Sequence, residues 1–234
     1  MTKSETAKFL RKISGGKYTV EVYADHESWL NGRMNGIGAS EAAAVLGKSP
    51  WMNERQLWER KKSPVAESGG NADTLRGHLS EEHIRELYAI ETNQEVLDGT
   101  NIILRSVEHP FMTASLDGII VHREPPCSMA EPIIASILEI KSVRNGGNEW
   151  TDDTMPNYYI LQVLHQLAVT GWMDAKLLAR FCRTYSWPKA YEREYLVRTC
   201  DYHDAIDKLI QKEQKFWEWN VVGNHVPRVS LPEL

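Results

Sequence analysis

The sequence predicts an α/β fold in which a mixed central β-sheet is flanked by α-helices. Two observations predict it: helical signals fill the first third of the chain, and short runs of Ile, Val and Leu separated by Pro and Gly follow them. The composition is that of an ordinary globular protein, with 42% hydrophobic and 25% charged residues among 234. We therefore expect a single domain, residues 1–234, with elaborations.

Three helices are expected first. Residues Ser40–Leu46 are rich in alanine and stop at a glycine, and Asn53–Lys62 begins with an asparagine cap that a glutamine follows three residues later. A loop, Lys62–Gly70, leads to a longer helix from about Asp73 to Glu91. Residues 1–28 are interpreted as an N-terminal extension.

Strand patterns dominate the rest of the chain. The expected strands are Asn101–Val107, Gly118–His122, Ile133–Val143, Ala175–Thr184 and Tyr191–Thr199. An uncharged helix, Pro156–Thr170, separates the third strand from the fourth. An amphipathic helix, Asp201–Asn220, with Asp201 as its cap, is followed by an irregular tail from Gly223.

Composition limits the cofactors and partners. The three cysteines, Cys127, Cys182 and Cys200, are too far apart for a CxxC site and too few for a four-thiolate cluster, so we expect reduced thiols in a cytoplasmic protein and no iron–sulfur cluster. Thr154–Met173 lacks charged residues, but its polar side chains would be costly in lipid, so no membrane partner is expected. The net charge of −5 argues against nucleic-acid binding unless basic residues gather on one face and cations offset the acids.

The strongest chemical signal is the run Ile137-Leu138-Glu139-Ile140-Lys141, in which an acid and a base interrupt an apolar strand at alternate positions. A strand repeats every two residues, so Glu139 and Lys141 share one face while Ile140 points to the other. The two other Glu-x-Lys pairs of the chain, Glu59–Lys61 and Glu213–Lys215, fall on charged helices, where we expect solvated side chains. By context alone, the strand pair is either a functional pair or a structural ion pair.

Asp117 is the second candidate, because it stands at a tight turn that enters an apolar strand. Asp-Gly is also a common hairpin turn, which is the structural alternative. Pairing of Asp117 with Glu139 on a neighbouring strand would supply two of the oxygen ligands that Mg²⁺ requires. Glu81 is a plausible third carboxylate, since on a helix it lies about 20° from Tyr88 and so at the edge of the inward stripe; the alternative is a solvated helix acid.

Several motifs in order resemble one family. They are Gly36-Ile37-Gly38-Ala39-Ser40-Glu41-Ala42-Ala43, Ser49-Pro50-Trp51, Gly77-His78-Leu79-Ser80-Glu81, Ala114-Ser115-Leu116-Asp117-Gly118, Leu138-Glu139-Ile140-Lys141-Ser142, and Gln162 with Val169-Thr170-Gly171. The chain resembles the YqaJ-type viral recombinase and phage lambda exonuclease family of PD-(D/E)xK nucleases. The likeness runs from about residue 29 to 171. The strands and helix expected in residues 172–234 are predicted from their hydrophobic pattern alone.

The resemblance implies a restriction-endonuclease-like core and a catalytic group of Asp117, Glu139, Lys141 and Gln162. It implies that Asp117, Glu139, the carbonyl of Ile140 and Glu81 bind or border two Mg²⁺ ions, for which Mn²⁺ can substitute, and that Lys141 orients or deprotonates the attacking water.

The same family resemblance assigns a 5′-terminal phosphate site to Arg33, Ser40 and Ser115. An arginine fork, a hydroxyl and backbone N–H groups suit an anion, although Arg33 as a surface residue and Ser40 as a simple cap are the structural alternatives. Leu116 and Leu164 depart from the family pattern, where a proline and a second glutamine are common.

The implied function is a metal-dependent exonuclease that degrades the 5′ strand of linear double-stranded DNA to mononucleotides and leaves 3′ single-stranded DNA for phage-type recombination. Double-stranded DNA ends, a single-strand annealing protein and a homotrimer are the implied partners, in the cytoplasm of a bacterial host. The alternatives are an endonuclease or a 3′-directed nuclease on the same core, or a non-catalytic DNA-binding module; the acidic balance favours the last.

Overall fold

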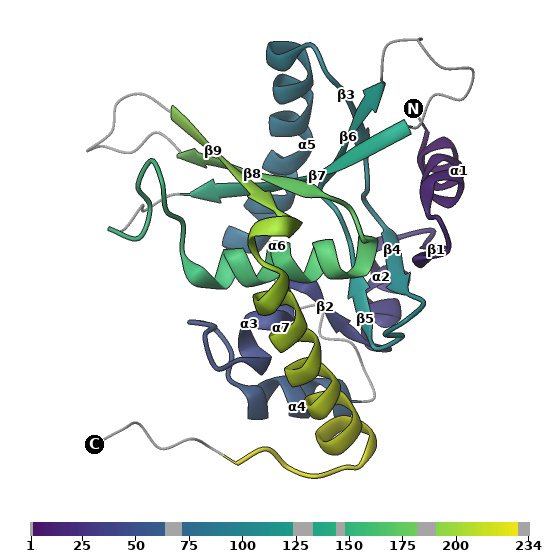
Figure 1. Cartoon of the computed structure of the whole chain (residues 1–234), viewed down its shortest axis with the longest axis vertical. Coiled ribbons are helices and arrows are strands. Elements are labelled where there is room, and N and C mark those ends of the chain that lie inside the picture. The colour runs from purple at the N-terminus through teal and green to yellow at the C-terminus, as the bar shows by residue number, and fades with distance from the viewer. Residues whose placement is uncertain (1, 64–71, 124–132, 144–147, 182–190, 229–234) are drawn as a thin grey trace.

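The described residues of a computed structural model, 2–63, 72–123, 133–143, 148–181 and 191–228, form two β-sheets with helices around them (Figure 1). A four-stranded sheet has the order β1-β4-β5-β2 and a five-stranded sheet the order β3-β6-β7-β8-β9. The strands are β1 (Tyr18–Val22), β2 (Ile37–Gly38), β3 (Glu95–Asp98), β4 (Ile102–Ser106), β5 (Met112–Ala114), β6 (Gly118–Arg123), β7 (Ile133–Val143), β8 (Asp174–Phe181) and β9 (Tyr191–Arg198).

The helices cover these sheets. They are α1 (Lys3–Ile13), α2 (His26–Arg33), α3 (Ala42–Val45), α4 (Glu54–Lys62), α5 (Ala72–Thr92), α6 (Asn157–Thr170) and α7 (His203–Lys215), with 3₁₀ turns at Ala39–Glu41 and Thr199–Asp201 and a π-helix at Phe216–Val222. The predicted α/β class with a mixed sheet is therefore confirmed. The four-stranded sheet was not predicted. Its strands β2 and β5 are only two and three residues long, and β1 lies in the N-terminal part of the chain, before the strand-rich region.

The five-stranded sheet places β7 at its centre. β7 pairs antiparallel with β6 and parallel with β8, and it is buried on both sides. Leu138 and Ile140 pack with Ile84 and Tyr88 of α5, while Ile137 belongs to the larger core on the opposite face. A strand buried on both faces has a nearly continuous apolar sequence. Against that background Glu139, on the same face as Ile137, is the exception.

Helix α6 runs along the other face of the five-stranded sheet, between that sheet and the α3, α4 and α7 layer (Figure 1). It begins after Pro156, which is the N-cap rather than the first helical residue, and ends at Gly171, whose φ of 67° is left-handed and favours glycine. Its buried residues include Gln166 and His165. Among the described residues, none of the helices has the length and apolar character that a bilayer crossing requires.

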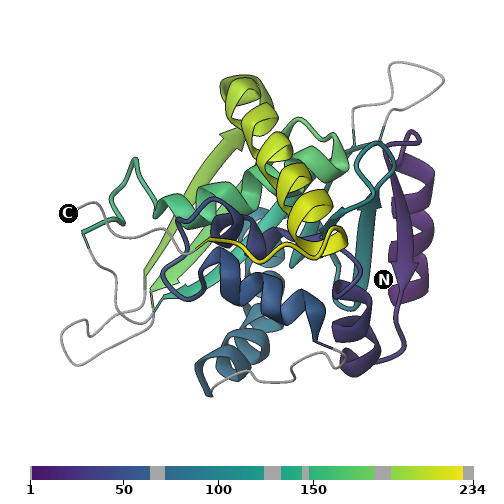
Figure 2. The ribbon, with the colours of Figure 1, turned by 90° about the horizontal axis from the view of Figure 1, so that it is seen from below.

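Residues before the family-matching region contribute a helix and a strand to the fold. Helix α1 lies along β1 at the outer edge of the four-stranded sheet (Figure 2), and Ala7, Leu10 and Tyr18 are buried in the main core. The capping box of α1, in which Thr2 and Glu5 exchange hydrogen bonds, was the available sequence signal.

Two further expectations are wrong. The final helix is capped at Tyr202 rather than at Asp201, which lies in a 3₁₀ turn, and its α-helical part ends at Lys215 before the π-helix. Lys61 and Glu213 are buried rather than solvated, because each meets a partner from elsewhere in the sequence. Other predictions concern segments outside the described residues: most of the predicted loop after Lys62, the two cysteines Cys127 and Cys182, and the end of the strand predicted to reach Thr184.

Candidate active site

Strands β6 and β7 bring the three central candidates together. Asp117 immediately precedes β6, and its Oδ2 accepts a hydrogen bond of 2.8 Å from the N–H of Ile140. Lys141 Nζ donates to Glu139 Oε1, so the predicted common face of these two residues is confirmed. The hairpin interpretation of Asp117 is wrong, because β5 and β6 belong to different sheets and the chain passes between the sheets at this residue.

Two glutamines of α6 hold the carboxylate of Glu139, which is 1% exposed. Gln162 Nε2 donates to Oε1 at 2.5 Å, and Gln166 Nε2 donates to Oε2 at 2.6 Å. Gln166 was missed by the sequence analysis, although its spacing of four residues from Gln162 puts both amides on one helical face. Leu164, where relatives often have glutamine, is buried in the core instead.

Asp117 is positioned from the backbone as well. The guanidinium of Arg85, on α5, donates to the carbonyl of Asp117 at 2.8 Å and pairs with Asp98 at 3.1 Å. Arg85 is buried, so this contact ties the turn before β6 to α5. The arrangement fixes where the Asp117 side chain points before any ligand binds.

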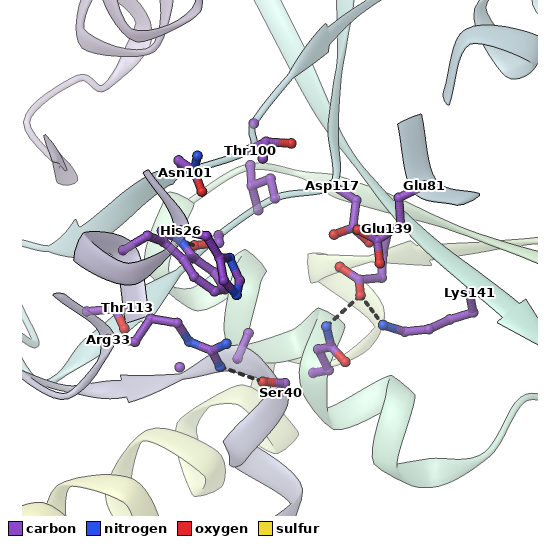
Figure 3. Close-up of a pocket in the computed structure, with 17 residues that line it drawn as sticks. His26, Arg33, Ser40, Glu81, Thr100, Asn101, Thr113, Asp117, Glu139 and Lys141 are labelled. Atoms are coloured by element: carbon purple, nitrogen blue, oxygen red, sulfur yellow. Dashed lines mark hydrogen bonds and ion pairs between the residues drawn. The ribbon is translucent and has the colours of Figure 1, made fainter. Parts of the chain in front are cut away.

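The carboxylates of Asp117 and Glu139 and the ammonium group of Lys141 influence one another's charge here. Burial raises the pKa of Asp117 well above its ordinary value, and the neighbouring Glu139 and Glu81 raise it further. Burial by itself lowers the pKa of Lys141, but Glu139 and Asp117 outweigh that effect and raise it. We name Glu81, Asp117, Glu139 and Lys141 the carboxylate end of the cavity (Figure 3). Its excess of negative charge favours a cation.

The cavity has a volume of about 200 Å³, and all the candidate side chains from Arg33 to Gln162 line it (Figure 3). Its lining also includes residues that the sequence did not indicate, namely His26, Trp29, Thr100 and Asn101. Trp29 and Arg33 share one face of α2, four residues apart, which a helix prediction for this segment would have revealed. Asn101 lies in the turn between β3 and β4 and has a φ of 59°, a conformation that asparagine adopts more readily than most residues.

Arg33, Ser40, Trp29 and Ser115 form the opposite, arginine end of the cavity. Arg33 Nη2 donates to Ser40 Oγ at 2.8 Å, and its guanidinium lies 4.8 Å from the centre of the Trp29 ring. Trp29 Nε1 in turn donates to Ser115 Oγ at 3.0 Å. The structure thus brings the three residues expected to bind phosphate onto one wall, with an indole as the scaffold between them.

The arginine end has an excess of positive charge. Burial alone raises the pKa of Glu41, but Lys61, Arg33 and Arg60 around it bring the pKa below its ordinary value. Lys61 Nζ lies 2.7 Å from Glu41 Oε2 and also donates a hydrogen bond of 3.0 Å to the backbone carbonyl of Arg33. Glu41 therefore balances part of a cationic group beside the cavity, and an anion would complete the balance.

The donor set of the carboxylate end fits a hard cation. Mg²⁺ takes oxygen ligands in octahedral geometry and keeps several waters. Among the described residues no group of three acidic, histidine or cysteine side chains has a geometry that could hold a metal ion, so the fit rests on the carboxylates of Asp117 and Glu139 together with water. Ile140, whose carbonyl was the third expected ligand, is not among the residues that line the cavity. Burial first, and then the neighbouring Glu139 and Glu81, raise the pKa of Asp117, and a bound cation would oppose these effects.

A family model described as the YqaJ-like viral recombinase domain matches residues 28–173, more than half of the chain. The chain belongs to the YqaJ-like viral recombinase family. An uncharacterised protein of this name, YqaJ of Bacillus subtilis (strain 168), is 30% identical over 210 residues, which cover 87% of this chain and 59% of that protein. The chain thus spans about three fifths of its relative.

Two solved structures share the fold of this YqaJ-like chain. An alkaline exonuclease (LHK-Exo) from Laribacter hongkongensis is 22% identical with a TM-score of 0.58, covering 85% of this chain and 96% of that one. A phage-related exonuclease from Haemophilus somnus 129PT is 14% identical with a TM-score of 0.53, covering 81% and 96%. The PD-(D/E)xK fold expected from the sequence is confirmed, and identities this low carry no more than the fold.

Proposed function

We propose that this chain is a metal-dependent DNA exonuclease of the phage recombination type. It degrades the 5′ strand of linear double-stranded DNA to mononucleotides and leaves a 3′ single strand. Membership of the recombinase family and the shared fold of exonucleases support the nuclease class. The polarity and the metal requirement rest on the chemistry of the cavity.

The observation that carries the proposal is the opposite charge of the two ends of one cavity. Asp117 and Glu139 provide oxygen ligands at one end, and Arg33 with Ser40 provides an anion-binding fork at the other. A DNA end presents a terminal phosphate and, next to it, a phosphodiester that needs a cation for hydrolysis. A strand with a 5′ phosphate would satisfy both ends at once.

In the proposed mechanism Asp117, Glu139 and the Ile140 carbonyl hold Mg²⁺, with Glu81 bordering the site; two ions are expected, and Mn²⁺ can substitute. When bound, the cation lowers the pKa of a coordinated water and offsets charge on the scissile phosphate. Gln162 and Gln166 orient the Glu139 carboxylate through hydrogen bonds to both of its oxygens. The protonated Lys141 orients the attacking water and donates towards the phosphate.

At the other end Arg33, Ser40 and Ser115 bind the 5′-terminal phosphate. The guanidinium can present a bidentate fork to two phosphate oxygens, and packing on Trp29 holds its plane. The hydroxyl of Ser40 now accepts from Arg33 and would exchange that contact for the phosphate. This end determines the polarity of digestion, because the metal chemistry is common to nucleases of either direction.

The deciding experiment is digestion of linear duplexes labelled at either end, with and without a 5′ phosphate, in Mg²⁺ and in EDTA. We expect release of mononucleotides from the 5′ label, dependence on the metal and faster digestion of phosphorylated ends. Cleavage of closed circles would favour the endonuclease alternative, and first release of the 3′ label would favour the 3′-directed one. If the wild-type protein digests no DNA with either Mg²⁺ or Mn²⁺, the alternative of a non-catalytic DNA-binding module would be favoured.

The remaining expectations belong to the same proposal. The 3′ strand would pass to a single-strand annealing protein, and a homotrimer around the duplex would explain processive digestion. The setting is the cytoplasm of a bacterial host that carries a phage or prophage. Residues 1–234 act as one nuclease domain. Sedimentation with and without duplex DNA tests the trimer.

A further inference from the structure

Trp51, Tyr158 and Tyr159 form a cluster beside the carboxylate end, which we name the aromatic shelf. The ring centroid of Trp51 lies 4.8 Å from that of Tyr158 and 6.1 Å from that of Tyr159, and the two tyrosines are 4.5 Å apart. The side chain of Trp51 is 67% exposed. An indole so exposed adds little to the core, so the folding of the chain does not account for it.

A turn before α4 and a buried tryptophan hold the rings of the aromatic shelf in place. Ser49 Oγ accepts hydrogen bonds of 3.3 Å from the N–H groups of both Trp51 and Met52, which fixes the turn that carries the indole. Tyr159 packs against the buried Trp150, with ring centroids 5.4 Å apart. The rings therefore have their positions before a ligand arrives, which lowers the entropy cost of binding.

The polar atoms of the aromatic shelf are available. Within the described part of the chain, the indole N–H of Trp51 and the hydroxyls of Tyr158 and Tyr159 form no hydrogen bond, and no parallel ring covers Trp51, whose two aromatic contacts are tilted by 75° and 47°. Trp219, also exposed at 57%, differs because its ring is stacked on His225 at 3.7 Å.

The aromatic shelf continues directly into the carboxylate end. Lys141 Nζ lies 5.2 Å from the ring centroid of Tyr159. Tyr158, Gln162 and Gln166 are four residues apart on α6, so the helical face that holds Glu139 also carries the shelf. Tyr158 lies about 6 Å from Gln162 along the helix axis. That is roughly the rise of two stacked bases at about 3.4 Å each.

We propose that the aromatic shelf stacks on an unpaired nucleobase one or two nucleotides from the scissile phosphate. The inference rests on the proposed function, because it assumes that a DNA strand enters the cavity. Every base has a π-face, so stacking on aromatic rings gives affinity without sequence preference. Stacking also needs no positive charge, which suits a chain with a net charge of −5. An unpaired base held here would keep the end of the duplex open beside the metal ligands.

The test compares a short fluorescein-labelled oligothymidylate with an abasic oligomer of equal length and charge. Binding is measured by anisotropy with Ca²⁺ replacing Mg²⁺, so that a cation is present while turnover is slow. The variants are Trp51→Ala, Trp51→Phe and Tyr158→Leu, with Trp219→Ala as the matched control at an exposed tryptophan that lines a separate hollow with Gln211 and Gln214 of α7. Circular dichroism verifies that each variant is folded.

We expect the wild type to prefer oligothymidylate over the abasic oligomer. Trp51→Ala should weaken oligothymidylate binding by roughly fivefold to a hundredfold and leave abasic binding unchanged. Trp51→Phe should keep most of the preference, and Trp219→Ala should keep all of it. Tyr158→Leu should reduce it as a second, independent variant.

The inference is overturned if the wild type binds both oligomers equally, or if the Trp51→Ala and Trp219→Ala proteins behave alike. It is also overturned if Trp51→Ala changes sedimentation of the DNA-free protein, because the aromatic shelf would then be a contact between copies of this chain. Base-dependent binding that needs Trp51, in a protein that does not digest duplex DNA with Mg²⁺, would support the shelf and reject the proposed exonuclease.

Discussion

The two ends of the cavity are built in opposite ways. At the carboxylate end, Asp117 directly precedes β6 and Glu139 lies on the paired strand β7. Buried donors on α5 and α6 bind the backbone carbonyl of Asp117 and the carboxylate of Glu139. At the arginine end, Arg33 and Ser40 come from a short helix and a 3₁₀ turn, and Ser40 is exposed. The first end has excess negative charge and the second excess positive charge. Under the proposed function, the groups for the chemistry are held by the buried central strands and helices, whereas the groups for the DNA end come from a short helix and a 3₁₀ turn nearer the surface.

Removal of a catalytic group at the carboxylate end should have the largest effect. Lys141→Ala should lower the rate of duplex digestion by about a hundredfold or more, because it removes the donor to the attacking water. Asp117→Asn should abolish activity at ordinary Mg²⁺ concentrations, because it removes a ligand charge. Single-turnover digestion of labelled duplex measures both. Full activity in either folded variant would mean that the carboxylates are structural.

Loss of the support behind the carboxylate end should come next. Gln166→Leu removes the donor to Glu139 Oε2, so we expect the Mg²⁺ concentration for half-maximal rate to rise about tenfold to a hundredfold. Thr170→Val is the matched control, because Thr170 is similarly buried on α6 but its hydroxyl bonds only to backbone groups, the carbonyls of Gln166 and Leu167 and the N–H of Trp172. Equal Mg²⁺ titrations of the two variants would contradict a role of Gln166 in positioning Glu139.

A change at the arginine end should alter substrate choice rather than metal use. Arg33→Ala should remove about tenfold to a hundredfold of the preference for 5′-phosphorylated ends, the expected value of a charge-assisted hydrogen bond. The Mg²⁺ titration should be unchanged. Arg55→Ala, in an exposed ion pair with Glu59, is the control. An unaltered ratio of rates on phosphorylated and unphosphorylated ends would remove Arg33 from end recognition.

The smallest expected effect is on stability. Burial, Glu139 and Glu81 raise the pKa of Asp117 in the folded metal-free protein, so the folded state binds more protons than the unfolded state at intermediate pH. The free energy of unfolding should therefore fall as the pH rises from the ordinary Asp pKa through the raised one. Thermal unfolding in EDTA should show this slope in the wild type, and Asp117→Asn should reduce it. If the unfolding temperatures of the wild type and of Asp117→Asn change with pH in the same way, Asp117 does not have a raised pKa in the folded protein.

Elements with a strong signal in their own local sequence were predicted correctly. The capping box at Asn53 and Gln56 and the eleven-residue apolar strand β7 were predicted to within a residue, since their information is contiguous. Short strands such as β2 and β5, and the helix α2 with its weak apolar face, were missed because tertiary pairing stabilises them. The burial of Glu213 was also missed, because it depends on His165, 48 residues away.

The sequence by itself determined the fold class and the common strand face of Glu139 and Lys141, because period-two alternation places both on one face wherever the strand lies. Gln162 and the phosphate-binding residues were predicted only from the family resemblance. Only the tertiary structure decided which groups surround Glu139 and Lys141. Gln166, Arg85 and Trp29 reach the site from helices distant in sequence, and their roles depend on contacts that no local pattern encodes. The charge of each end of the cavity was decided in the same way, since it results from burial and from the neighbours that folding brings together.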